Sequence, residues 1–153
     1  MSSALELEKY GPSAAGTWES MRAPLLWGVI VGGIQAASPL AFWWLDAATV
    51  YALGLALIAS VYIGFAVADG RRTVIAVECG VASVFVVLAA MGVTASAWVL
   101  VLGLAGHGVK DAWQQRSRYV SGTRWWPPFC AAVDVVVASL IAIQILVGAR
   151  FHG

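Results

Sequence analysis

A run of 34 residues, from Thr73 to Gly106, contains a single charged side chain, that of Glu78. One α-helix of this length would extend about 51 Å, at about 1.5 Å per residue. The hydrocarbon core of a bilayer is only about 30 Å thick and is crossed by about 20 helical residues. The run therefore predicts two membrane-spanning helices, with the turn between them in the small and polar residues 91–96.

Composition extends this conclusion to the whole chain. Of its 153 residues, 61% are hydrophobic and 11% are charged, whereas soluble domains average about 45–50% apolar and about 25% charged residues. A soluble protein of this length could not hide so much apolar surface, because about a third of its surface stays exposed. The net charge of +1 gives no field that would attract a polyanion. A soluble enzyme, a disordered chain and a nucleic-acid binder are excluded, and the lipid bilayer is the expected partner.

Three further apolar runs are long enough to cross a membrane, so we expect an all-α bundle of five transmembrane helices. Residues 1–22 are expected to form a flexible cytoplasmic tail, and residues 23–150 a single membrane domain. Pro39 lies inside the first span, where it should kink the helix or end it early. The expected spans are 24–45, 47–68, 73–91, 94–112 and 129–149.

The basic residues indicate the orientation of these spans. With five spans, eight of the nine basic residues fall on the side that holds the N-terminal tail, and only Arg150 falls on the other. Because basic residues concentrate on the cytoplasmic side of membrane proteins, we expect a cytoplasmic N-terminus and an extracytoplasmic C-terminus. The expected location is a plasma membrane.

Four ionisable side chains remain at membrane depth, near the cytoplasmic ends of the spans. They are Glu78, His107, Asp111 and Asp134. Asp111 follows His107 by four residues, so both lie on one helix face. Ionisable groups in a membrane are costly and usually mark a functional site. We therefore take these four as candidate catalytic or binding residues.

These residue types support several chemistries. Imidazole and carboxylates together can bind a divalent metal, transfer protons, or act as a general acid and base. For a metal, the candidate ligands are His107, Asp111 and Asp134, with Cys130 as a softer ligand one turn before Asp134. The sequence has no closely spaced ligand pair of the kind found in zinc motifs, so it does not identify a cofactor.

Three arginines near the same ends, Arg116, Arg118 and Arg124, are expected to ring a cytoplasm-facing cleft formed by the acids and to attract anionic headgroups. The first hypothesis is a site that binds or transforms an amphiphilic or anionic small molecule. One alternative is an accessory or scaffold subunit that meets a protein partner or a second copy through glycine-rich faces. For the face of Gly28 and Gly32, packing against another helix of the same chain is expected ahead of a contact between chains. A second alternative is a proton- or cation-coupled transporter.

Two segments carry a resemblance to a family. The sequence GHGVKD at 106–111, followed by WWPPFC at 125–130 and Asp134, resembles a pattern in uncharacterised small bacterial multi-pass membrane proteins. The likeness covers about 30 residues, roughly a fifth of the chain. It implies a bacterial inner membrane and directs attention to His107, Asp111 and Asp134. Gln114 and Gln115 stand where that pattern has a further histidine.

Overall fold

The computed structural model describes residues 14–151, which form five α-helices and no strand. The helices are α2 (Ala14–Ala41), α3 (Ala47–Asp69), α4 (Arg72–Thr94), α5 (Ala97–Ser117) and α6 (Trp126–Leu146). The expected all-α fold is confirmed, and the 34-residue run divides within its predicted turn. The first thirteen residues of the predicted tail lie outside the described residues.

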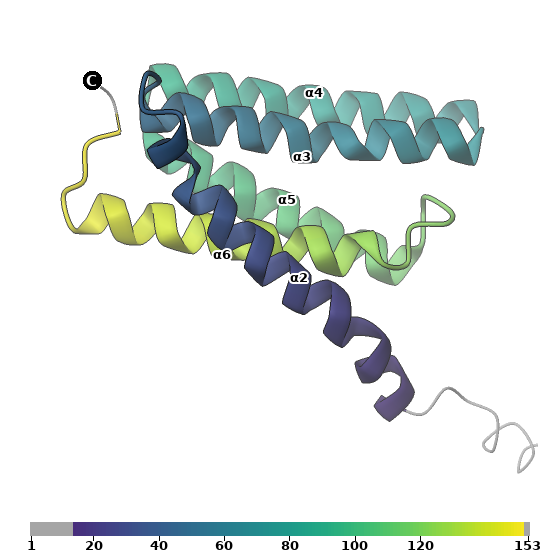
Figure 1. Ribbon diagram of the computed structural model, residues 1–153. Coiled ribbons are helices and arrows are strands. Elements are labelled where there is room, and N and C mark those ends of the chain that lie inside the picture. Colours follow the sequence, from purple (N-terminus) through teal and green to yellow (C-terminus); the bar gives the residue numbers. More distant parts are fainter. Residues whose placement is uncertain (1–13, 152–153) are drawn as a thin grey trace, which may run out of the picture.

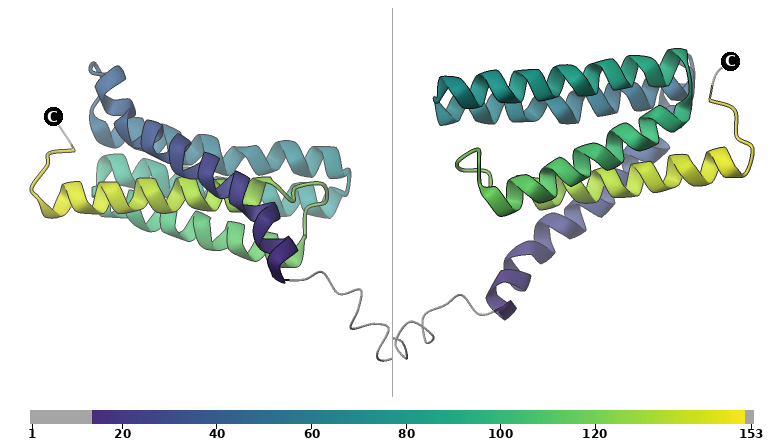
Figure 2. Two further views of the ribbon diagram at one scale, coloured as in Figure 1. Left: turned by 60° about the horizontal axis from the view of Figure 1, so that its bottom comes forward. Right: turned by 180° about the vertical axis from the view of Figure 1, so that it is seen from behind.

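The helices form one bundle (Figure 1; Figure 2) with two clusters of buried hydrophobic residues. Helices α3 and α4 form an antiparallel hairpin, α5 packs against α6, and α2 crosses α6 obliquely. The loops that join α3 to α4 and α5 to α6 lie at one end of the bundle, where the Arg71 side chain donates a hydrogen bond of 2.6 Å to the carbonyl oxygen of Tyr119. At the other end, the backbone amide of Ala48 donates to the carbonyl of Phe151. The loops thus alternate between two ends, as expected for successive spans.

Helix α2 differs most from the prediction. It begins at Ala14 and not near Pro24, so residues 14–22 are helical. The prediction placed the start where apolar residues begin, but alanine, glutamate and methionine favour a helix without being part of an apolar run. The helix ends at Ala41, two residues after Pro39 and before the predicted residue 45, so it ends early as expected. Proline lacks the N–H that would bond to the carbonyl of Gln35, and the Ser38 hydroxyl donates to that carbonyl at 2.6 Å instead.

The other helix boundaries follow local chemistry. Asp46 caps α3 by accepting a hydrogen bond from the Thr49 amide, and Gly70 ends that helix with a φ of 81°. Helix α6 begins three residues earlier than predicted, so its two prolines occupy the first turn. It ends at Leu146, before the predicted residue 149, because Gly148 adopts a φ of 84°.

Four helices are long and apolar enough to cross a membrane: Glu19–Ala41 within α2, then α3, α4 and α6. Large apolar side chains face outward from the bundle, as lipid contact requires, and Leu40 is 83% exposed. Helix α5 is long enough at 21 residues but is less apolar. Its polar residues are His107, Lys110, Asp111, Gln114, Gln115, Arg116 and Ser117.

Glycines allow close contact between helices inside the chain. A Cβ atom at Gly28 would meet the backbone of Phe129 and lie 2.6 Å from the Cβ of Ala132, and one at Gly32 would lie 2.9 Å from the Cβ of Val136. The face of Gly28 and Gly32 therefore packs against α6 of the same chain, as expected, and is not free to meet a partner.

Candidate functional site

Helix α5 has a polar stripe that faces the core. His107, Asp111 and Gln114 follow one another at spacings of four and three residues, and none of them is more than 1% exposed. The opposite face carries Val109 and Trp113, which are 71% and 51% exposed. The helix is thus apolar outside and polar inside, the reverse of a helix on the surface of a soluble protein.

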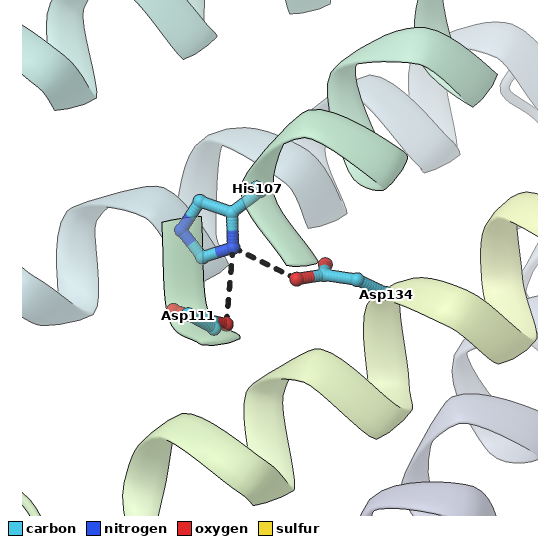
Figure 3. A group of neighbouring side chains, drawn as sticks. All are labelled: His107, Asp111 and Asp134. Atoms are coloured by element: carbon cyan, nitrogen blue, oxygen red, sulfur yellow. Dashed lines mark hydrogen bonds and ion pairs between the residues drawn. The ribbon is translucent and has the colours of Figure 1, made fainter. Parts of the chain in front are cut away.

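The centre of the site is a contact between α5 and α6. The Nδ1 atom of His107 lies 2.8 Å from Oδ2 of Asp134 and 3.5 Å from Oδ2 of Asp111 (Figure 3). All three side chains are almost fully buried. Gly108 makes the contact between the two helices close, since a Cβ atom there would lie 3.4 Å from the Cβ of Asp134.

A second ion pair lies on another face of α5. Lys110 donates from Nζ to Oε2 of Glu78 on α4 at 2.7 Å, and its Nζ lies 3.2 Å from the centre of the Tyr62 ring. Glu78 is 2% exposed. Both Glu78 and Asp134 lack a basic residue within one helical turn in the sequence, yet each has a partner from another helix.

Aromatic rings cover the imidazole of His107. The Phe85 ring on α4 lies 4.9 Å from the centre of the imidazole, and the Tyr62 ring on α3 lies 6.1 Å from it, both edge to face. The site therefore joins α3, α4, α5 and α6. Its walls are apolar, which strengthens electrostatic interactions inside it.

Hydrogen bonding in the site is incomplete. Among the described residues, every buried side-chain nitrogen or oxygen without a hydrogen bond belongs to this region. These atoms are Tyr62 Oη, His107 Nε2, both carboxylate oxygens of Asp111, Gln114 Oε1 and Asp134 Oδ1. Five of the six are oxygens, which can accept from a donor or bind a cation. Buried polar atoms are rarely left without a partner, and a concentration of them points to a bound ion, water or ligand.

The charges of the site do not balance. Three buried carboxylates, from Glu78, Asp111 and Asp134, face one lysine. With a neutral His107 the excess is two negative charges. An uncompensated buried charge is very costly, so the site requires a cation or bound protons.

The predicted ligands differ in their placement. The three residues whose ligand atoms lie within 4.8 Å of one another are His107, Asp111 and Asp134. Cys130 is buried one turn before Asp134 on α6, but it does not belong to this group. Of the metal ligands expected from the sequence, the structure therefore brings together three and leaves out the thiol.

The arginines lie apart from the acids. Arg118 and Arg124 line a depression of about 330 Å³ on the loop between α5 and α6, together with Ser121 and Thr123. None of the four candidate acid or histidine residues lines this depression, and Arg116 does not line it either. This depression therefore holds two of the three expected arginines and none of the acids.

Three residues of the site were not among the candidate site residues expected from the sequence. They are Lys110, Tyr62 and Gln114, of which Gln114 was noted only because it stands where the resembling pattern has a histidine. The spacing from His107 and Asp111 continues to Gln114, so the stripe itself could have revealed the glutamine. Lys110 was counted with the basic residues of the cytoplasmic side, and its pairing with Glu78 depends on how α4 and α5 pack. Tyr62 has no sequence signal that distinguishes it from other interfacial aromatic residues.

Comparison with known proteins adds no assignment. No protein-family model, curated protein sequence or solved structure matches the chain. The geometry and charge of the buried site are therefore the basis for a functional proposal.

Proposed function

We propose that this is a multi-pass membrane protein that binds a divalent cation between His107, Asp111 and Asp134. The observation that carries the proposal is the meeting of one imidazole nitrogen and two carboxylate oxygens within 4.8 Å. A divalent cation would offset the excess of two buried negative charges. It would also contact carboxylate oxygens of Asp111 and Asp134 that make no hydrogen bond.

The donor set favours certain metals. Imidazole suits zinc and iron, and carboxylate oxygens suit manganese and magnesium. A mixed set of one nitrogen and two oxygens is suited to Zn²⁺, Fe²⁺ or Mn²⁺. The cation would take the place of the proton on Nδ1, since a ligating histidine must give up that proton. Three protein ligands leave a coordination position for water or substrate.

The charge argument favours a cation over an anionic small molecule as the first ligand. Beyond the site, toward the end that carries Arg150, the core is formed by apolar side chains such as Leu55, Leu100 and Ile141. A pathway of ionisable groups across the bundle is not present in the described part of the chain. We therefore favour binding at a fixed site over coupled transport, and the internal glycine contacts give no support for a scaffold.

Calorimetric titration of Zn²⁺ into the purified protein tests this proposal. The expected stoichiometry is one zinc per chain, with affinity lowered at least about tenfold by Asp134→Asn or His107→Ala. Asp46→Asn is the matched control, because it removes a carboxylate at the far end of α3 while asparagine still caps the helix. Folded wild-type protein that binds no zinc, or equal affinity in Asp134→Asn, would contradict the proposal.

We also propose five spans, with α5 as the fourth, in a bacterial inner membrane. At 21 residues, α5 would extend about 32 Å, and its polar stripe is turned away from lipid. One end of the bundle holds the α3–α4 and α5–α6 connections, and four arginines lie in or beside these connections: Arg71, Arg72, Arg118 and Arg124. This concentration of basic residues supports a cytoplasmic N-terminus. The family resemblance supports the bacterial location.

A phosphatase reporter fused after Gly153 tests the number of spans. It should be active, because it would lie outside the cytoplasm, and an inactive but expressed fusion would contradict five spans.

A further inference from the structure

A lateral pocket leads from the outer surface of the bundle to the buried site. It has a volume of about 170 Å³ and lies among α2, α3, α5 and α6. Its exposed rim includes Val31, Leu57 and Trp126, of which Leu57 is 71% exposed. Its inner end includes Leu104 and Asp134, which are at most 3% exposed. The rim belongs to helices that are apolar enough to lie in lipid, so a ligand would enter from the bilayer.

The pocket is shaped for a hydrocarbon group. Its lining is almost entirely apolar, and its volume is similar to that of an engineered cavity of about 150 Å³ that binds benzene. Such a space accommodates a short length of chain or a ring and leaves the rest of a longer molecule in the lipid. Helix α2 crosses the bundle obliquely (Figure 1), and its residues Val31 and Gln35 line the pocket together with residues of α3.

The inner end of the pocket includes one carboxylate, that of Asp134, and one of its two oxygens has no hydrogen bond. Asp134 lines the pocket, and its Oδ1 atom is buried without a hydrogen bond, while Oδ2 contacts His107. An acceptor of this kind requires a donor. A ligand carboxylate would be repelled by Asp134, and an ammonium group would compete with the proposed metal ion. A hydroxyl group donates without adding charge.

We propose that this pocket binds a long-chain alcohol from the lipid phase, with its chain among α2, α3 and α6 and its hydroxyl at Asp134. The inference rests on the proposed function in one respect: the hydroxyl oxygen would lie beside the bound cation and could occupy its open position. This gives the proposed cation site a substrate class, an apolar alcohol that reaches it laterally.

Photocrosslinking in phosphatidylcholine nanodiscs tests the pocket. The probe is a twelve-carbon alcohol with a diazirine on its chain, and labelled peptides are located by mass spectrometry. We expect labelling at pocket residues of α3 and α6, reduced at least fivefold by excess 1-dodecanol and much less by dodecane. Labelling spread evenly over the lipid-facing residues, or equal competition by dodecane, would overturn the proposal. Stronger competition by dodecylamine than by 1-dodecanol in the presence of Zn²⁺ would overturn the choice of an alcohol.

Two substitutions on α2 provide a matched comparison. Val31→Trp places a large side chain at the rim of the pocket and should abolish the competed labelling. Ile34→Trp lies one turn further on the same helix, is 67% exposed in the wild type and does not line the pocket, so labelling should persist. Equal labelling in both variants would contradict entry through this rim.

The cation and the alcohol can be tested separately. Adding Zn²⁺ after chelation should increase competed labelling several-fold if the cation binds the hydroxyl. Zinc binding without competed labelling would overturn the alcohol site alone. Competed labelling without zinc binding would overturn the proposed function and leave the pocket as a site for alcohols that donate directly to Asp134.

Discussion

The Nδ1 atom of His107 and the Oδ2 atom of Asp134 lie 2.8 Å apart, although 27 positions separate the two residues in the chain. Both side chains are buried between α5 and α6, and Asp111 completes a group with a single imidazole and two carboxylates. The contact lies within the packed interface between α5 and α6. It is also the place where buried negative charge exceeds positive charge.

Substitution of Gly108 should separate effects on the site from effects on α5 itself. Gly108→Ala should be tolerated, because its Cβ would lie 3.4 Å from the Cβ of Asp134, which is at van der Waals contact. Leucine would overlap the Asp134 side chain and should weaken zinc binding about tenfold or more, which corresponds to about 1.4 kcal/mol. Gly106→Leu is the control on the other side of His107, where the nearest atom is Phe85 Cε1 at 3.8 Å. Zinc titrations that give the same affinity for both leucine variants would contradict this geometry.

The Lys110–Glu78 pair should be strongly coupled. Lys110→Met leaves the Glu78 carboxylate buried without its partner and should lower the free energy of unfolding by about 3 kcal/mol. The double variant Glu78→Gln/Lys110→Met should recover much of this loss, because neither charge then remains. Unfolding in mixed micelles of increasing sodium dodecyl sulfate content measures both. Additive effects of the two single substitutions would indicate that the pair does not interact in the membrane.

The contact between α2 and α6 should depend on Gly28. A Cβ atom at Gly28 would lie against Phe129 and Ala132, so Gly28→Ala should destabilise the protein by about 1–3 kcal/mol. Gly33→Ala is the matched control, because a Cβ atom there meets nothing within 4 Å. The same micelle assay compares the two variants, with molecular mass measured in parallel. If Gly28→Ala instead stayed fully stable but lost a dimer, the glycine face would be an interface between copies.

The loop between α5 and α6 should depend on Asp69. The Asp69 carboxylate accepts hydrogen bonds from the Arg71 guanidinium and from both the amide and the hydroxyl of Ser121. Asp69→Asn removes this charged acceptor and should increase trypsin cleavage at Arg118 and Arg124 several-fold. Asp46→Asn at the opposite end of α3 should leave the rate unchanged. Cleavage of Asp69→Asn at the wild-type rate would indicate that the loop is held by other contacts.

The sequence predicts much of this fold, because a chain in lipid must satisfy its backbone hydrogen bonds internally and few secondary structures do so. The apolar runs locate α3, α4 and α6 to within a few residues. Helix length requires a turn within the 34-residue run, and the small and polar residues 91–96 indicate where it lies. The start of α2 could not be found in this way, since residues 14–22 are helical without being part of an apolar run. Pro39 indicated correctly that the first helix ends before residue 45, and the Ser38 hydroxyl donates to the carbonyl that proline leaves without a donor.

The site could be predicted only in part. The cost of ionisable groups in a membrane identified Glu78, His107, Asp111 and Asp134, and all four lie in the buried region. Which of them pair depends on helix rotation and crossing, and these are not encoded in local spacing. For this reason Cys130 was expected as a ligand on the face of Asp134 but does not join the group of three. The pairing of Lys110 with Glu78, 32 positions away, was likewise not foreseeable.

X-ray absorption at the zinc edge, on purified protein loaded with one equivalent of Zn²⁺, tests the central claim most directly. We predict a first shell of nitrogen and oxygen at about 2.0–2.2 Å, with the scattering pattern of one imidazole and no sulfur. Asp134→Asn should fail to hold the metal, whereas Asp46→Asn should give the wild-type spectrum. A sulfur shell at about 2.3 Å, or a spectrum of fully hydrated zinc, would contradict a cation site made by His107, Asp111 and Asp134.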